Sequence, residues 1–175
     1  MSGPLSALTG TSTAPTAAPS PREVVLAFIA DITAAHAGEP IDPFRRFADD
    51  GVMIIPGDTP LSGEWRKPSF YTEFLPKAMQ LMGTKPGQGL CPSRVIAEGN
   101  RVAVLARGRG SAISGRPYNN VYFLFFEVRG PQIMRYFEGF DSSLAFQAIF
   151  DVHLERPPLQ NVTRTPTLND RPTTS

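Results

Sequence analysis

The segment with the clearest chemical potential is residues 115–141, in which the acid Glu138 follows a long apolar stretch. Residues 118–128 are mostly apolar or aromatic, which is typical of a strand covered on both faces. Residues 132–140 predict a second strand, which brings Glu138 into the same apolar surroundings. A carboxylate in such a place needs a partner or a chemical role, because an isolated buried charge is costly. Glu138 is therefore the first candidate for a general base or acid.

The composition argues against several other functional classes. A net charge of +1 gives no electrostatic reason to expect a nucleic acid or an anionic membrane as partner. The chain has two histidines, His36 and His153, which lie far apart, and one cysteine, Cys91, so we expect no metal site and no cofactor. No apolar run is long enough to span a membrane, and no signal peptide is evident, so a cytoplasmic location is expected.

The chain is expected to form one domain at residues 21–152. A disordered tail at residues 1–20 and a Pro/Thr-rich tail at residues 153–175 are expected to flank it, because neither can bury enough apolar area to offset its chain entropy. Helices mainly precede antiparallel strands, which is the α+β pattern. Hydrophobic periodicity and turn signals predict helices at 20–38, 42–48, 67–82 and 142–150, and strands at 52–55, 89–98, 101–111, 118–128 and 132–140.

Three short motifs, in this order and spacing, resemble the SnoaL-like branch of the nuclear transport factor 2-like superfamily. They are Ala48-Asp49-Asp50, the Gly-Arg-Pro-Tyr-Asn run at 115–119, and the Glu-Gly-Phe-Asp run at 138–141. The branch includes ketosteroid isomerase, limonene epoxide hydrolase and polyketide cyclases, and the resemblance covers about residues 21–151. It implies a cystatin-like roll, in which a curved antiparallel sheet wraps round N-terminal helices to form a cone with an apolar cavity. It also implies a homodimer formed through the outer face of the sheet.

The catalytic sets of these relatives are not retained in this chain. The isomerase's base and neutral acid fall on Ile55 and Leu124, and its helical phenol falls on Phe28. One acid of the hydrolase falls on Glu138, but the other falls on Arg107. Because one fold hosts many functions, the resemblance by itself assigns no reaction.

The resemblance implies an apolar pocket with a few polar groups, as in most small-molecule sites. Glu138 would transfer a proton, Arg107 would stabilise an anion, and Tyr122 would donate a hydrogen bond to a carbonyl. Alternatively, Glu138 and Arg107 form a buried ion pair that only fixes the sheet. Asp141 is expected to cap the last helix. The residues expected to bind the ligand on the cavity side are Met53, Ile55, Trp65, Phe70, Phe74, Arg109, Asn120, Leu124 and Phe140.

Two functional hypotheses follow from these patterns. The first is a cofactor-independent enzyme of the cyclase, isomerase or hydrolase type, which acts by acid–base chemistry on a small hydrophobic molecule with a carbonyl or carboxylate. The second is a non-catalytic small-molecule-binding or dimeric interaction module with a degenerate cavity. The positions of the Glu138 and Arg107 side chains discriminate between the two hypotheses, because a closed ion pair would remove the proposed base.

Overall fold

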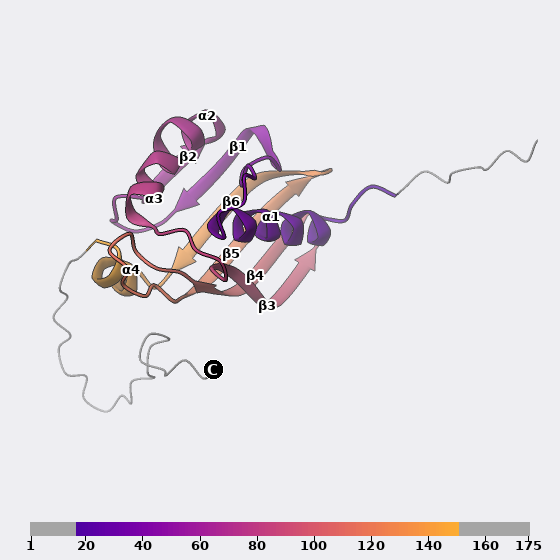
Figure 1. Ribbon diagram of the computed structural model, residues 1–175. Coiled ribbons are helices and arrows are strands. Elements are labelled where there is room, and N and C mark those ends of the chain that lie inside the picture. The colour runs from indigo at the N-terminus through magenta and orange to yellow at the C-terminus, as the bar shows by residue number, and fades with distance from the viewer. Residues whose placement is uncertain (1–16, 151–175) are drawn as a thin grey trace, which may run out of the picture.

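The structure, a computed structural model, describes residues 17–150. The expected tails, 1–20 and 153–175, lie outside the described residues apart from residues 17–20. The described part is α+β: helix α1 (Pro21–His36) lies across the concave face of a curved six-stranded sheet (Figure 1). No helix in this part of the chain is long and apolar enough to cross a membrane.

Helix α1 begins where the sequence predicts, because its first turn is closed by a capping box. The backbone N–H of Glu23 donates to Ser20 Oγ at 3.3 Å, and the Ser20 N–H donates to the Glu23 carboxylate at 2.7 Å. Pro21 fits the first turn, where its missing N–H costs no helical hydrogen bond. The apolar stripe that faces the sheet consists of Val24, Val25, Phe28 and Ile29, all buried.

The sheet has the strand order β2-β1-β6-β5-β4-β3. Strands β1 and β6 are parallel, whereas every other neighbouring pair is antiparallel. The expected curved sheet round the N-terminal helix is thus confirmed, but it is mixed rather than wholly antiparallel. No local signal dictates how β1 and β6 pair, because most of the domain separates them in sequence. The strands are β1 (Phe47–Ile55), β2 (Gly63–Arg66), β3 (Gly89–Glu98), β4 (Arg101–Arg109), β5 (Asn120–Arg129) and β6 (Gln132–Phe140).

The helix predicted at residues 42–48 is absent, and a turn leads directly into β1 at Phe47. The Asp42 side chain accepts a hydrogen bond from the Phe44 N–H at 2.8 Å, an Asx-type contact that favours a turn over a helix. The predicted strand at 52–55 therefore extends back to Phe47. Strand β2, which pairs with β1, has no counterpart among the predicted elements.

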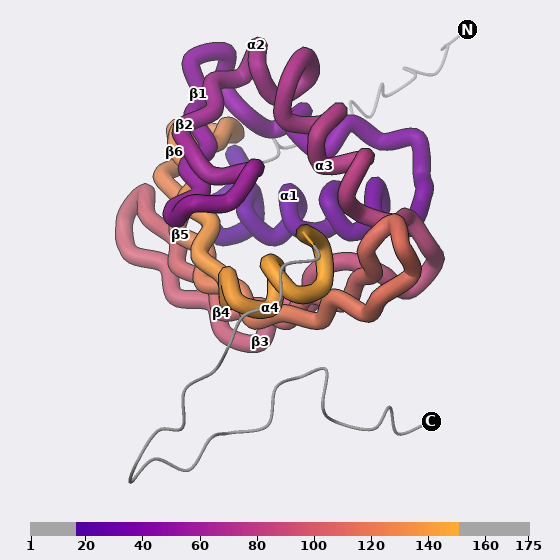
Figure 2. The backbone as a smooth tube through the Cα atoms, turned by 90° about the vertical axis from the view of Figure 1, so that its left-hand side faces the viewer, coloured from indigo at the N-terminus to yellow at the C-terminus, as the bar shows by residue number. Residues whose placement is uncertain are grey.

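The helix predicted from residue 67 is present but divided into three pieces. These are α2 (Lys67–Ser69), the π-helical turn η1 (Phe70–Phe74) and α3 (Leu75–Leu81). Pro76 explains the widened turn, because proline has no N–H to donate and its ring needs space from the preceding turn. Figure 2 shows α1 enclosed between this segment and the sheet.

The core is organised around Phe28 on α1. Its ring meets Phe47, Phe126 and Tyr136 edge to face, with centroids 5.4, 5.7 and 5.3 Å apart. Phe126 and Tyr136 stack on each other at 4.8 Å. Because all four side chains are almost wholly buried, they fix the position of α1 over strands β5 and β6.

An ion cluster around the buried Asp31 joins α1 to the chain that leads into β1. Asp31 is only 4% exposed and accepts hydrogen bonds from Arg45 Nε and Nη2 at 2.9 and 2.8 Å. Arg46 Nε donates to the same carboxylate at 2.7 Å. Burial raises the pKa of Asp31, but the two guanidinium groups outweigh it and the pKa is lowered.

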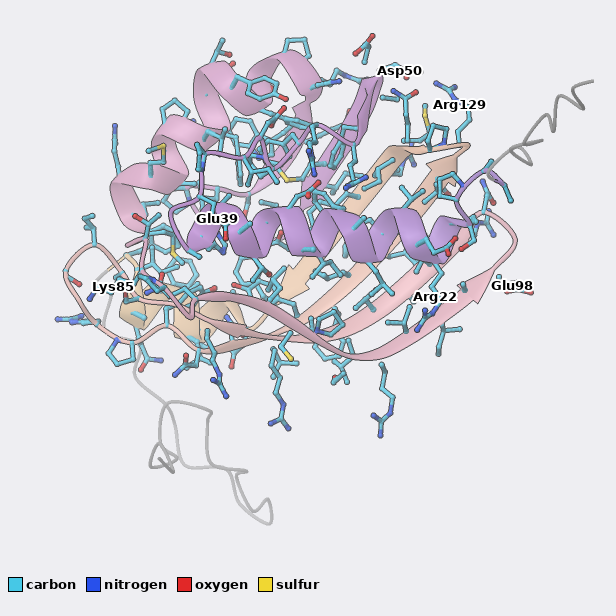
Figure 3. All side chains as sticks on the ribbon, turned by 45° about the vertical axis from the view of Figure 1, so that its right-hand side comes forward. Arg22, Glu39, Asp50, Lys85, Glu98 and Arg129 are labelled. Carbon is cyan, nitrogen blue, oxygen red and sulfur yellow. The ribbon has the colours of Figure 1, made fainter. Side chains whose placement is uncertain are left out.

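We expect Asp31→Asn to destabilise the protein by about 2 kcal/mol, because it removes the charge that holds both arginines. The matched control is Asp50→Asn, which breaks the exposed ion pair of Asp50 with Arg129 (Figure 3) and should cost less than about 1 kcal/mol. Urea unfolding at pH 7 measures both changes. Since the pKa of Asp31 is lowered, the stability it adds is present above the unfolded pKa near 3.8 and is lost as the pH falls through the folded pKa. Equal losses for the two variants would contradict this account.

Candidate functional site

The candidate site lies on the face of the sheet that is turned toward α1. Glu138 on β6 pairs with Leu124 on β5, and Leu124 is 2% exposed. Tyr136, two residues earlier on β6, shares this face and contacts Phe28 of α1. Glu138, Tyr136, Tyr122 and Tyr118 form what we call the acid–phenol cluster.

Glu138 is held by one strong hydrogen bond. The hydroxyl of Tyr136 donates to its Oε2 at 2.5 Å, and Tyr136 itself is 1% exposed. Glu138 keeps some surface accessible to solvent, yet the surrounding protein removes most of the solvation of its carboxylate. Burial raises the pKa of Glu138, and the Tyr136 hydrogen bond offsets this only in part. No cationic side chain among the described residues contributes to this balance.

The three phenols of the cluster are protonated hydrogen-bond donors at physiological pH. Burial raises the pKa of Tyr118 to about 12, although hydrogen bonds from its neighbours lower it. Burial also raises the pKa values of Tyr122 and Tyr136 well above their ordinary range. The Glu138 charge raises all three further, which places the carboxylate within electrostatic range of every phenol. The cluster thus combines one proton acceptor with neutral O–H donors.

Asn120 positions parts of the site, and its amide is fully committed to the protein. It is 0% exposed, and its Nδ2 donates to Tyr118 Oη and to the Asp141 carbonyl, both at 3.0 Å. Its Oδ1 accepts from the Val121 and Asp141 N–H groups at 2.7 and 3.1 Å. An amide offers two hydrogens and two lone pairs, and here all are in use. The expected ligand contact of Asn120 is therefore replaced by a positioning role.

Arg107 and Arg109 lie on the opposite face of the sheet, so their expected place beside Glu138 is wrong. Both are exposed, whereas their neighbours are buried: Ala106, which precedes Arg107, and Gly108, which lies between the two arginines. The expected alignment is one residue out along β4, and a shift of one residue turns every side chain to the other face. The alternative of a buried Glu138–Arg107 ion pair fails for the same reason.

The inward position 108 on β4 has no room for a residue larger than glycine. It pairs with Asn120, and a Cβ added to it would collide with the ring of Tyr122. The Tyr122 ring thus lies against the backbone of β4 at Gly108, a close approach that only glycine permits. Tyr122 also faces Phe140, with ring centroids 6.0 Å apart.

The expected apolar wall residues are all buried or partly buried in the main core. Met53 pairs with Trp65 on β2 and with Tyr136 on β6, so it borders the cluster directly. Phe70 lies further away, against Phe47. The remaining wall residues in the same core are Ile55, Trp65, Phe74, Leu124 and Phe140.

The sequence analysis did not select Tyr118 or Tyr136. Tyr136 carried a usable signal, because it lies two residues before Glu138 and therefore shares its face in a strand. Tyr118 carried none, because it precedes β5 and strand periodicity does not indicate where its side chain lies. Asp141 caps α4 (Ser142–Ala148) as expected, accepting from the Ser143 N–H at 3.0 Å.

Residues 17–150 contain no group of three or more His, Cys, Asp or Glu side chains placed to hold a metal ion. Cys91 is exposed. Burial lowers the pKa of His36, which therefore favours the neutral imidazole at the end of α1.

No protein-family model matches the sequence, and no curated protein matches it significantly. Solved structures do match. TerC, co-crystallised with polyporic acid, has a TM-score of 0.62 and 22% identity over 75% of this chain and 99% of its own. An NTF2-like protein from Burkholderia xenovorans LB400 has a TM-score of 0.56 and 22% identity, covering 74% and 95%. IdmH from Streptomyces antibioticus, described as a candidate polyketide cyclase, has a TM-score of 0.52 and 18% identity, covering 70% and 95%. The chain therefore has the NTF2-like fold, as the sequence resemblance implies.

The raised pKa of Glu138 predicts a stability change for Glu138→Gln. A carboxyl that binds its proton more tightly in the folded state destabilises the fold once the pH rises through its raised pKa. Glutamine removes that charge and can still accept from Tyr136. We expect the variant to melt about 2 °C higher than the parent at pH 7.5.

The advantage of Glu138→Gln should disappear below pH 4.5, where the carboxyl is protonated in both the folded and the unfolded chain. Differential scanning calorimetry across this pH range measures it. The control is Glu39→Gln at an exposed position, which should show no such trend. A lower melting temperature of Glu138→Gln at pH 7.5 would contradict the assignment.

Proposed function

We propose that the chain is a cytoplasmic, cofactor-independent enzyme of the isomerase, cyclase or hydrolase type, which acts by acid–base chemistry on a small apolar metabolite. The observation that carries the proposal is Glu138, a carboxylate with a raised pKa and no cationic partner among the described residues. A structural carboxylate would be expected to pair with an arginine or a lysine. A base for proton abstraction works best with a pKa that is moved toward neutral pH.

The proposed step is the transfer of a proton from a substrate carbon or a water molecule to Glu138. Tyr136 orients the carboxylate through Oε2, which leaves Oε1 to accept the proton. Negative charge that develops on a substrate oxygen would be stabilised by the hydroxyl group of Tyr122. Glu138 would then return the proton to another position of the substrate, so that the carboxylate is regenerated at the end of the cycle.

The proposed ligand space is the part of the concave face where inward side chains keep accessible surface. Glu138, Tyr122 and Phe140 are partly exposed there, whereas Leu124 and Tyr136 are not. The cavity expected from the sequence resemblance would lie over these three residues, with Met53, Ile55, Trp65 and Phe74 as further wall. Two proteins of the same fold support a small, apolar ligand: TerC, co-crystallised with polyporic acid, and IdmH, described as a candidate polyketide cyclase.

A homodimer is also part of the proposal. The outer face of the sheet exposes Phe123 by 63%, Phe125 by 40% and Phe137 by 39%. These three lie on the adjoining strands β5 and β6, where Phe125 pairs with Phe137. A contiguous exposed aromatic patch of this kind marks an interaction surface, and a second copy of the chain offers a matching one. The same observation favours the alternative function, a dimeric binding module in which the acid–phenol cluster holds a ligand without chemistry.

The catalytic proposal predicts that Glu138 promotes proton abstraction from a simple probe. The probe is 5-nitrobenzisoxazole, a small apolar molecule whose ring opens when a base removes its carbon-bound proton. We expect Glu138→Gln to lower the rate constant about 100-fold. In the parent, the rate should rise with pH through a midpoint above 4.5, because only the ionised carboxylate accepts a proton and its pKa is raised.

The matched control for this measurement is Arg107→Gln. Arg107 lies on the outer face, so the structure gives it no part in the reaction and the rate should be unchanged. Undiminished turnover in Glu138→Gln would sink the enzyme proposal and leave the binding module. A large loss in Arg107→Gln would instead show that the assignment of faces is wrong.

The dimer proposal predicts that Phe123→Glu yields a monomer. A charge in the centre of the aromatic patch should weaken self-association by about 100-fold, since buried aromatic residues dominate such interfaces. Light scattering with size-exclusion chromatography measures the mass of the particle. The control is Met79→Glu on α3, which changes a residue that is 68% exposed but off the sheet. A monomeric parent, or a Phe123→Glu variant that remains dimeric, would refute this surface.

A further inference from the structure

We propose that the hydroxyl pair of Tyr118 and Tyr122, oriented by Asn120, is the hydrogen-bond donor of the site, which together with the Glu138 charge selects an uncharged carbonyl ligand over a carboxylate. The inference rests on the proposed function and names the ligand class of the same site. It replaces the broader expectation from the sequence, which admitted both a carbonyl and a carboxylate. It also assigns to Asn120 the role of a positioning residue that acts through Tyr118.

The orientation of the Asn120 amide is fixed by the backbone. Its Oδ1 accepts from two N–H groups, those of Val121 and Asp141, so its NH2 group must point the other way. One hydrogen of that NH2 group goes to Tyr118 Oη at 3.0 Å. The oxygen of Tyr118 is therefore an acceptor in this bond, and its own hydrogen must point elsewhere. A donor into a hydroxyl oxygen also strengthens the bond that this hydroxyl donates.

The two phenols together have one hydrogen more than the protein uses. The hydroxyls of Tyr118 and Tyr122 lie near each other, so at most one of the two hydrogens is taken up between them. Whichever way that contact runs, the other hydrogen has no acceptor among the described residues. Tyr136 differs, because its hydrogen is committed to Glu138. The pair therefore presents one free O–H within electrostatic range of the Glu138 carboxylate.

The charge of the site favours an uncharged ligand. Arg107 and Arg109, the cations expected beside Glu138, lie on the outer face. A ligand carboxylate would meet the Glu138 charge in apolar surroundings without a counter-ion, which is strongly unfavourable. A carbonyl oxygen needs only a donor, and the phenol pair offers one. The Tyr122 ring is held in place by its close approach to Gly108, so the donor is rigid before the ligand arrives.

The test uses three ligands of similar size: acetophenone, benzoate and benzylammonium. The chain has one tryptophan, Trp65, and it lies in the proposed wall, so its single indole N–H resonance reports binding in 1H–15N spectra of the full chain. We expect acetophenone to bind at least about tenfold more tightly than benzoate, a factor equivalent to about 1.4 kcal/mol, because the benzoate charge would lie beside Glu138 without a counter-ion. Tighter binding of benzoate, or of benzylammonium as a cation held by Glu138, would overturn the proposal.

Variants test whether the phenol pair is the donor to the carbonyl. Tyr118→Phe combined with Tyr122→Phe should lose the preference for acetophenone over ethylbenzene, which lacks the carbonyl and should bind as before. Asn120→Asp should have the same effect through Tyr118, because a carboxylate accepts the phenolic hydrogen that Asn120 leaves free. An unchanged preference in either variant, with ethylbenzene binding retained, would contradict the assignment.

The milder Tyr122→Phe keeps the test decisive if the double variant does not fold. It leaves Tyr118 as the only donor of the pair, so acetophenone affinity should fall only in part. Glu138→Gln should retain the preference for acetophenone over ethylbenzene, since the phenols supply it, and should bind benzoate more tightly because the opposing charge is removed. Undiminished turnover in Glu138→Gln, with the preference for acetophenone over ethylbenzene intact, would contradict the proposed function alone. Lost turnover in Glu138→Gln, together with no such preference in the parent, would contradict the ligand class alone.

Discussion

The register of strands β4, β5 and β6 is the constraint on which the candidate site depends. Leu124 lies opposite both Val104 and Glu138, so these three side chains must share the inward face. The same pairing sends every odd-numbered residue of β4 outward, including Arg101, Arg107 and Arg109. The interior therefore receives a carboxylate and two phenols, Tyr122 and Tyr136, but no guanidinium group from these strands. The chemistry of the site is set by a backbone property, the two-residue period of the pleat.

Packing makes this register rigid and supplies the environment that tunes the site. Phe28 locks α1 over Phe126 and Tyr136, and the buried Asp31 cluster ties the same helix to the approach to β1. Tyr136 is at once part of this aromatic core and the hydrogen-bond partner of Glu138. Stability and function thus share a residue, because the ring holds the fold while the hydroxyl orients the acid. A site with one acceptor and several donors in apolar surroundings suits reactions in which a proton moves and charge collects on an oxygen.

Much of the fold could be predicted from the sequence, because its signals are local. The cap at Ser20 and the strand limits of β3 and β6 follow from residues within a few positions. The parallel pairing of β1 with β6 could not be predicted, since it joins segments with no shared local signal. The side of the sheet on which Arg107 lies was predicted wrongly for a related reason. An alignment that is one residue out turns every side chain of a strand to the opposite face. Glu138 was found because an acid in an apolar strand is conspicuous, whereas Tyr118 precedes β5 and strand periodicity does not indicate where its hydroxyl points.

The strand order has a kinetic consequence for how this chain reaches its native state. Strands β3 to β6 form a meander of neighbours in sequence, joined by two tight hairpins and by the connection at 110–119, so this half can assemble early from local contacts. Strand β1 must instead wait for β6, since Phe47 pairs with Ile133 far along the chain. Until then the edge of β6 and the aromatic side of α1 stay unpaired. On a ribosome, closure of the sheet must follow synthesis of nearly the whole domain, so the nascent chain passes through a stage at which it can aggregate.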